Sequence, residues 1–488
     1  MHLNLLAAAS AAVLFTAACG SSDDTPAPVV TPKNVIFFLG DGYGIVPMTA
    51  ARIYAAGEDG ELAMDTLPET AFVKTYSLDA QVTDSAPSMA AYMTGVKTRN
   101  EVLAMNGETL AVAPGKDAAT GVNSAVNNCP MSGNGAASTT LLELAIAQGR
   151  ATGVVSTARL THATPAATYA HVCHRNAEYE IARQAVPGGA GFNTALGGGI
   201  DVLMGGISQY WRPYSAANNV AGRPDGRDLV AELQGKGYTF VSDSASFNAA
   251  PVVAGMKLIG LYDFAKAEGH MSYELDRDPA KEPSLAEMTT KSMDILSKNA
   301  KGYFLMVEGG RIDHALHSTN AARALADAKA FDDAVKAAIA KARLTDPDLL
   351  NTLIVVTADH DHTMVMNGYA SITGKTTATN PGILGLMRDY ANPAVPAIDA
   401  DGKTFTTLAF GNGENRVAGS RSLMTTLTDA AVSDKNYHQE AAIQTGIGGE
   451  THGGGDVFLG AIGLGADTFH GMLDNTDVFK LVRTAVGL

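Results

Sequence analysis

The chain has 488 residues, enough for one large α/β domain with insertions or for two to three ordinary domains. Hydrophobic residues make up 46% and charged residues 17%, a composition that predicts a globular protein and excludes a disordered one. The 35 Lys and Arg against 50 Asp and Glu give a formal net charge of -15, which argues against nucleic-acid binding.

The N-terminal segment predicts export. Residues 3–18 form an apolar, Ala-rich run that is too short to span a membrane, so residues 1–18 are expected to be a signal peptide. Thr16-Ala17-Ala18-Cys19-Gly20 is similar to a bacterial lipobox, in which Cys19 would carry a lipid anchor; the alternative is an ordinary secretory signal without lipid. Residues 19–33 predict a flexible tether. The protein is thus expected in the bacterial periplasm or on a membrane as a lipoprotein.

Four short apolar runs predict buried parallel strands, at residues 35–39, 153–155, 303–307 and 353–356. Helical stretches alternate with them, at residues 88–96, 139–148 and 321–342. This order predicts a doubly wound α/β fold with a mostly parallel central sheet and helices on both faces. Because ligands gather beyond the carboxyl ends of such strands, the polar residues that follow each run predict one shared site.

Two stretches lack clear periodicity, residues 186–255 and residues 367–449. The second is long for a connection, so it is expected to be an insertion near the active site of a domain that covers residues 34–488.

Two cysteines follow Cys19, at Cys129 and Cys173, which excludes a disulfide-rich scaffold. One bridge between them and two unpaired thiols are both compatible with the sequence.

Ser85 stands where a helix is expected to begin, in Asp84-Ser85-Ala86-Pro87. Taken alone, such a serine is a helix cap. A helix N-terminus also presents free N–H groups and a partial positive charge to a phosphate. No histidine lies near Ser85 in the sequence, so a metal is a better candidate activator than a local Ser-His-Asp triad.

Clusters of acids and histidines follow two of the predicted strands, in Glu308-Gly309-Gly310-Arg311-Ile312-Asp313-His314-Ala315-Leu316-His317 and in Thr357-Ala358-Asp359-His360-Asp361-His362. On a helix, the spacing of four places Asp313 and His317 on one face, where they could hold one zinc ion. The alternatives are a solvated turn for the first cluster and an exposed strand edge for the second. Three further residues give little indication of function when taken alone: Thr164, Arg175 and His452, the last of which lies in a Gly-rich loop.

These motifs, in this order, resemble those of the alkaline phosphatases. The resemblance covers about residues 34–480 and rests on the segments 34–42, 83–86, 94–98, 155–158, 163–175, 307–317, 357–360 and 450–453. It implies the hydrolysis of small phosphate monoesters through a phosphoserine on Ser85, with two Zn²⁺ and one Mg²⁺. It also implies a homodimer.

The resemblance further implies a role for each site residue. The first Zn²⁺ would be held by Asp313, His317 and His452; the second by Asp41, Asp359, His360 and the Ser85 oxygen; and the Mg²⁺ by Asp41, Thr164 and Glu308. Arg175 would clamp the phosphate oxygens. Residues expected behind the ligands or against the substrate are Asp84, His162, His314 and His362. At His162 and His314 some bacterial relatives carry Asp and Lys, and here the chain is similar to the animal enzymes.

Two other functions fit parts of the same pattern. A related phosphodiesterase or sulfatase could use the same pair of metals with a different pocket. A surface lipoprotein that stores zinc or captures phosphate without turnover would need the ligands but would have no use for Ser85.

Overall fold

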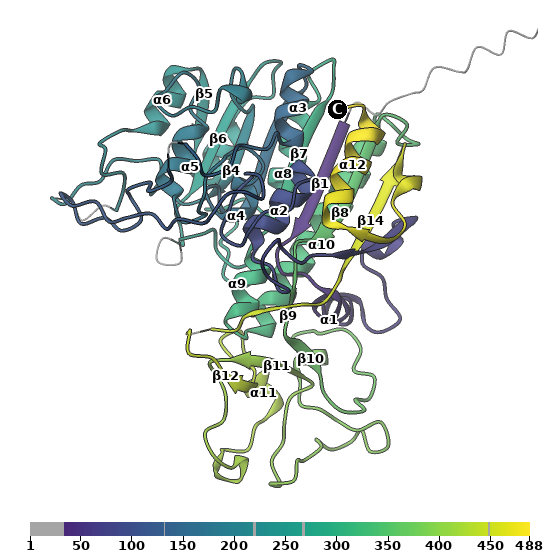
Figure 1. Ribbon diagram of the computed structural model, residues 1–488. Helices are drawn as coiled ribbons and strands as arrows, with labels where there is room; N and C mark the ends of the chain where they lie inside the picture. The colour runs from purple at the N-terminus through teal and green to yellow at the C-terminus, as the bar shows by residue number, and fades with distance from the viewer. Residues whose placement is uncertain (1–33, 131, 218–220, 266–268, 448) are drawn as a thin grey trace, which may run out of the picture. The chain divides into compact units, whose positions relative to one another are not determined.

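A ten-stranded sheet forms the centre of the fold (Figure 1). The computed structural model describes residues 34–488 except 131, 218–220, 266–268 and 448, so the expected signal peptide, Cys19 and the tether lie outside the described residues. The strands are, in spatial order, β15 (Gly471–Asp474), β2 (Glu69–Lys74), β14 (Val457–Gly463), β8 (Thr352–Ala358), β1 (Asn34–Gly40), β7 (Tyr303–Gly309), β3 (Ala151–Arg159), β4 (Val202–Gly206), β6 (Lys257–Tyr262) and β5 (Tyr238–Val241).

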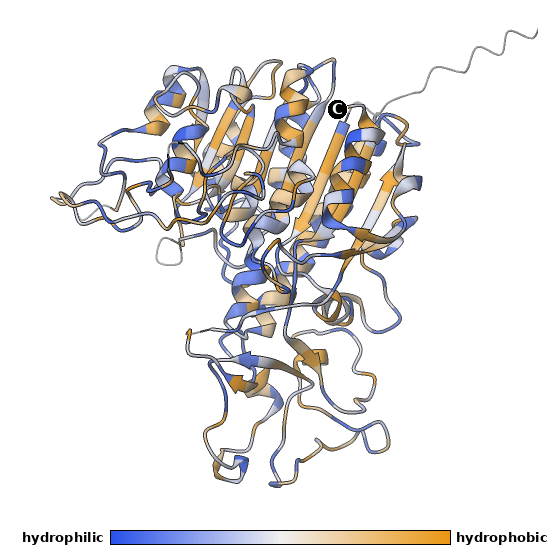
Figure 2. Ribbon diagram, in the orientation of Figure 1, coloured by the Kyte–Doolittle hydropathy of each residue, from blue (hydrophilic) through white to orange (hydrophobic). Residues whose placement is uncertain are grey.

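The sheet is parallel except at β14, which runs antiparallel to β8 and to β2. Strands β7 and β8 are buried along their whole length, and β1 is buried after its first residue. This explains why their sequences are unbroken apolar runs, and Figure 2 shows the central strands as the most hydrophobic part of the fold. The predicted fold class is therefore confirmed.

Two groups of helices cover the sheet. Helices α8 (Leu285–Leu296) and α10 (Ala321–Arg343) pack on each other and on the central strands, whereas α2 (Ser85–Thr94) joins α3 (Leu141–Ala147), α4 (Ala163–Ala166) and α12 (Asn475–Val486) in the other group. The remaining helices are α1 (Ile45–Ala56), α5 (Glu178–Gln184), α6 (Leu229–Gly235), α7 (Ser244–Ala249), α9 (Arg311–His317) and α11 (Asp429–Val432). Short 3₁₀ turns cover Met64–Thr66, Thr194–Leu196, Gly382–Leu384, Arg421–Leu423 and Ala466–Thr468.

Two smaller sheets follow β8 in the chain. The residue pairs of β9 (Asp361–His362) and β13 (His452–Gly453) run antiparallel, with His452 opposite His362. The other sheet combines β10 (Met364–Met366), β11 (Leu408–Gly413) and β12 (Ala441–Gln444). The stretch 367–449, expected as an insertion, thus holds two of these strands and shares none with the large sheet.

The interpretation of residues 186–255 as irregular is wrong, because this stretch contains β4, α6, β5 and α7. The strands β4 and β5 are only five and four residues long, so neither leaves a strong periodic pattern. The two cysteines that the sequence left open are bridged, with the Cα atoms of Cys129 and Cys173 5.7 Å apart. Over the described part of the chain, none of the helices has the length and apolar character needed to cross a membrane.

The register of the central strands determines which residues meet at the carboxyl ends of the strands. Gly40, the last residue of β1, lies opposite Gly309 of β7 and Ala358 of β8. Asp41 and Asp359 therefore follow their strands at the same level, and Glu308, which pairs with Leu39, lies two residues before that level. Three carboxylates that are far apart in the sequence meet at one edge of the sheet.

Candidate active site

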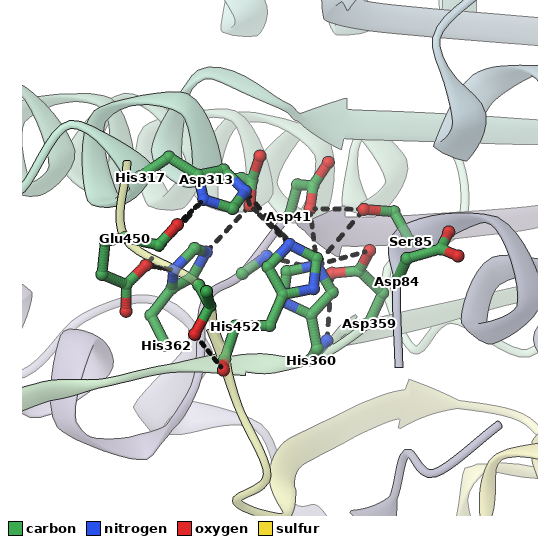
Figure 3. Close-up of polar contacts among 12 residues, drawn as sticks. Asp41, Asp84, Ser85, Asp313, His317, Asp359, His360, His362, Glu450 and His452 are labelled. Carbon is green, nitrogen blue, oxygen red and sulfur yellow. Dashed lines mark hydrogen bonds and ion pairs between the residues drawn. The ribbon is translucent and has the colours of Figure 1, made fainter. Parts of the chain in front are cut away.

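Ser85 is the first residue of α2, and the side chain of Asp84 caps this helix by accepting a hydrogen bond from the N–H of Ala86 at 2.6 Å. The serine is thus inside the helix rather than its cap. Ser85 is 1% exposed, and its Oγ lies 3.2 Å from Nε2 of His360 and 3.4 Å from Oδ1 of Asp41 (Figure 3). The hydroxyl therefore faces side chains from the ends of β1 and β8.

The first of three polar groups around this hydroxyl consists of Asp41, Asp359 and His360, whose candidate ligand atoms lie within 4.8 Å of one another. All three are fully buried. Nε2 of His360 lies 3.3 Å from Oδ1 of Asp41 and 3.5 Å from Oδ2 of Asp359. The helix is tied to this group because Ser88 donates a hydrogen bond to the carbonyl of Asp359 at 2.6 Å.

The second group surrounds Asp313. Its Oδ1 lies 3.2 Å from Nε2 of His317, one turn later on α9, and 3.5 Å from Nε2 of His452. The two imidazoles face each other with their Nε2 atoms 3.1 Å apart. The rings of His452 and His360 stack with centroids 3.4 Å apart, so this group adjoins the first one (Figure 3).

The third group lies on the other side of Asp41 and contains Glu308, His162 and Thr164. Candidate ligand atoms of Asp41, His162 and Glu308 lie within 4.8 Å of one another, and Oγ1 of Thr164 lies 3.4 Å from Oδ2 of Asp41. Ser156 donates a hydrogen bond to Oε2 of Glu308. Asp41 thus has one oxygen toward Ser85 and His360 and the other toward Thr164.

Burial and mutual repulsion raise the pKa values of three acids at the site, Asp41, Asp359 and Glu308. Burial, followed by the negative charge of Asp313, raises the pKa of Asp41 to about 7. Burial, followed by the charge of Asp41, raises the pKa of Asp359 to about 7, and burial beside Asp41 raises that of Glu308 well above its ordinary value. A set of carboxylates with these pKa values calls for positive charge in its midst.

Unpaired atoms show where that charge fits. Within the described chain, Oδ2 of Asp359, Oε1 of Glu308 and Nδ1 of His162 are buried and have no hydrogen-bond partner. Buried polar atoms rarely lack partners, and carboxylate and imidazole atoms in close groups are the ligands that Zn²⁺ and Mg²⁺ prefer. The residues therefore fit bound divalent cations.

Arg175 lies beside the serine helix. Its Nη1 donates to Oδ1 of Asp84 at 3.1 Å, and its Nη2 lies 3.0 Å from Nε2 of His162. A cavity of about 210 Å³ opens next to this guanidinium, lined also by Glu101, Arg159, Ala163, Asn176 and Glu178.

The structure brings all the residues expected at the site into these neighbourhoods. His314 lies next to His162, with the ring centroids 5.1 Å apart. His362, which sequence alone left as a residue behind the ligands or on the surface, is buried with Nε2 2.8 Å from Oδ1 of Asp313. Burial lowers the pKa of His362, but the negative charge of Glu450 and the hydrogen bonds to Asp313 and Glu450 outweigh this effect and raise the pKa to about 10.

Two residues at the site were not expected from the sequence. The ring of His270 lies against that of His314, tilted by 45° with the centroids 3.9 Å apart, and Nδ1 of His362 contacts Oε2 of Glu450 at 2.6 Å. Glu450 stands two residues before His452, and this closeness in sequence is a usable signal. His270 follows no strand and belongs to no motif, so nothing near it in the sequence points to the site.

Comparison with known proteins gives a consistent result. The sequence model of the alkaline phosphatase family matches residues 32–488. The chain is 36% identical over 466 residues to the tissue-nonspecific alkaline phosphatase isozyme of Gallus gallus, covering 90% of this chain and 82% of that one. It is 34% identical over 469 residues to the same isozyme of Homo sapiens, covering 90% and 81%.

Solved structures agree. The alkaline phosphatase of Thermus thermophilus matches with a TM-score of 0.64 and 25% identity, covering 98% of this chain and 96% of that one. The enzyme of the Antarctic bacterium TAB5 matches in fold, with a TM-score of 0.61, 22% identity and coverage of 94% and 99%. The chain belongs to the alkaline phosphatase family of enzymes.

Proposed function

We propose that this protein hydrolyses phosphate monoesters through a phosphoserine on Ser85, at a site with two Zn²⁺ and one Mg²⁺. The observation that carries the proposal is the position of the Ser85 hydroxyl, at the start of a buried helix and within 3.4 Å of both Asp41 and His360. A nucleophile there lies at the positive end of α2 and beside the proposed ligands of the second Zn²⁺.

The proposed ligands divide among the three groups described above. Asp313, His317 and His452 would hold the first Zn²⁺, Asp41, Asp359, His360 and Ser85 the second, and Asp41, Thr164 and Glu308 the Mg²⁺. When bound, the metals act as Lewis acids that favour the ionised serine and stabilise the leaving oxygen. Three divalent cations bring six positive charges against the four carboxylates, an excess of two that suits a doubly charged monoester.

The chain itself orients and attacks the substrate. Arg175, held by Asp84, would bind two non-bridging phosphate oxygens through its planar guanidinium. Ser85 Oγ then forms a bond to phosphorus as the bond to the alcohol oxygen breaks, and the alcohol leaves. Water hydrolyses the phosphoserine, releases phosphate and regenerates the hydroxyl. Two displacements give overall retention at phosphorus.

The test is phosphate release from an aryl phosphate by the parent and the Ser85→Ala protein. We expect activity to fall to background while the metal content stays unchanged. The matched control is Ser292→Ala, which removes another buried hydroxyl, bonded to the carbonyl of Met288 within α8, and should leave activity intact. A parent without activity, unaffected by Ser85→Ala, would instead support zinc storage or phosphate capture.

Substrate class is tested by comparing rates on an aryl phosphate, a bis-aryl phosphate and an aryl sulfate. The monoester should be much the fastest, because Arg175 and the excess positive charge suit a dianion. Faster turnover of the diester or the sulfate would support the related phosphodiesterase or sulfatase.

Export, a lipid anchor at Cys19 and a homodimer complete the proposal. The Cys129–Cys173 bridge supports export, because disulfides persist mainly in oxidising compartments. Mass spectrometry of the mature N-terminus would show whether Cys19 is lipidated, and light scattering would give the oligomeric state.

A further inference from the structure

Glu450 is a buried acid that the proposed reaction does not use. It is 1% exposed, and each of its carboxylate oxygens has partners. Oε2 accepts a hydrogen bond from Nδ1 of His362 at 2.6 Å, while Oε1 accepts from N and Oγ1 of Thr363 at 2.7 Å and 2.5 Å. A buried carboxylate with three donors is held in one orientation, so it also holds the ring of His362.

The ring of His362 passes this constraint to the first zinc site. Its opposite nitrogen, Nε2, lies 2.8 Å from Oδ1 of Asp313, one of the three proposed ligands there (Figure 3). Glu450, His362 and Asp313 thus form a continuous chain of polar contacts. Asp313 belongs to α9, whereas His362 belongs to β9, so the chain joins two separate elements.

The backbone of Glu450 holds a second proposed ligand. Its N–H donates to the carbonyl of His317 at 2.8 Å, and its own carbonyl lies 2.6 Å from Nδ1 of His317. With Nδ1 engaged in this way, Nε2 of His317 is the nitrogen that faces His452. One residue therefore contacts His317 directly and Asp313 through His362.

We propose that Glu450 is a positioning residue for the first zinc site, where its carboxylate orients Asp313 through His362 and its backbone orients His317. The inference rests on the two-zinc site proposed above. Groups that fix the far side of a metal ligand keep its donor atom aimed at the ion, and their removal weakens binding even though they do not touch the metal.

The test is Glu450→Gln, which keeps the size of the side chain but replaces one acceptor oxygen by an NH₂ group. Metal-free parent and variant are titrated with Zn²⁺ in competition with a chromophoric chelator, without substrate. We expect one of the two zinc sites of the variant to bind about 10- to 100-fold more weakly and the other to be unchanged. The visible absorption spectrum of the Co²⁺-loaded variant should also change, because it reports ligand geometry.

Glu143→Gln is the matched control. Oε1 of Glu143 lies 2.7 Å from Nε2 of His171, and in the described chain neither residue is hydrogen-bonded to a proposed metal ligand. This variant should lower the Tm of the metal-free protein without changing either zinc affinity or the Co²⁺ spectrum. The control thus distinguishes the general effect of losing a buried acid–imidazole contact from a specific effect on the zinc site.

A milder variant keeps the test decisive if Glu450→Gln does not fold. Thr363→Val removes the hydroxyl donor to Oε1 but keeps the backbone donor, and should weaken the same zinc site to a smaller extent. Parent-like zinc affinities in the folded variants would overturn the role of Glu450 alone. A parent that does not bind two zinc ions would overturn the proposed site and, with it, this role.

Discussion

The guanidinium of Arg175 contacts Asp84 at the start of the serine helix, and its orientation depends on Asp84 and His162. Replacing it by Ala removes charge-assisted hydrogen bonds to the phosphate, which are worth about 1.5–3 kcal/mol. The expected result is a fall in kcat/KM on an aryl phosphate of about 10- to 150-fold, measured by steady-state kinetics.

The control for Arg175→Ala is Arg212→Ala, which removes a guanidinium paired with Asp228 outside the site. Its kcat/KM should match that of the parent. An Arg175→Ala protein with parent-like kcat/KM would contradict the phosphate-clamp role.

Asp327 is a buried acid on α10 that is not among the proposed ligands. Burial raises its pKa to about 7, although the positive charge of Arg311 offsets part of this rise. The folded state therefore keeps the proton that the unfolded chain has already lost, so the stabilisation is complete below about pH 4 and is lost as the pH rises through about 7. In Asp327→Asn, the free energy of unfolding should fall less between pH 4 and pH 7 than in the parent.

Urea unfolding of both proteins across this pH range measures the difference. Metal release at low pH affects parent and variant alike, so it cancels in the comparison. Parallel pH profiles would contradict the raised pKa of Asp327.

At this scale the sequence was informative where a residue stands beside a strand end or a motif. Asp41, Asp313 and Asp359 could be predicted for that reason. The contact of Glu450 with His362 could not, because it joins residues 88 positions apart and no local pattern encodes the pairing.

Among the elements, the turn after β1 packs tightly against the site. Gly42 has φ of +67° and donates its N–H to Oδ1 of Asp359 at 3.0 Å. A Cβ at this position would lie 2.4 Å from Nε2 of His362. Glycine is therefore required both by the backbone conformation and by the space.

Gly42→Ala should lower Tm and displace His362, with weaker zinc binding as a second effect. Gly226→Ala is the matched control, because Gly226 has a similar φ of +72° but no atom within 4 Å of a new Cβ. The control should cost about 1–2 kcal/mol from backbone strain alone and leave zinc binding unchanged. Differential scanning calorimetry and zinc titration measure both effects; equal losses in the two variants would show that packing at Gly42 is unimportant.

Elements were predictable in proportion to their length and burial. Strands β1, β7 and β8 are continuous apolar runs, and the 23-residue helix α10 has sustained periodicity. Strands β9 and β13 have two residues each, so they arise from pairing with each other rather than from their own sequences. That pairing nevertheless places His452 opposite His362.

For the molecule as a whole, the metals and the fold should stabilise each other. Chelation should abolish activity and lower Tm, because Asp41, Glu308, Asp313 and Asp359 are then buried together without cations. Adding back Zn²⁺ with Mg²⁺ should restore both, as measured by phosphate release and thermal unfolding.

The Ser85→Ala protein is the control for this cycle, since it should recover Tm but not activity. Recovery of full activity with Mg²⁺ alone would contradict the two-zinc assignment.

At this largest scale the doubly wound topology followed from the alternation of apolar runs and helical stretches, whereas the site depended on the resemblance of many ordered motifs. Sequence spacing could pair Asp313 with His317 on one helix. It could not show that Asp41 would be shared between two groups, since that depends on the register of three strands.

The antiparallel strand β14 has a consequence for biosynthesis. It is preceded in the chain by β13, which carries His452, so the proposed centre draws on side chains from residue 41 to residue 452. The proposed centre of a nascent polypeptide stays incomplete until the ribosome has translated His452. Translation products that stop before His452 would keep most of the sheet but could not complete the proposed centre, so the proposed metals would bind late in the maturation of each molecule.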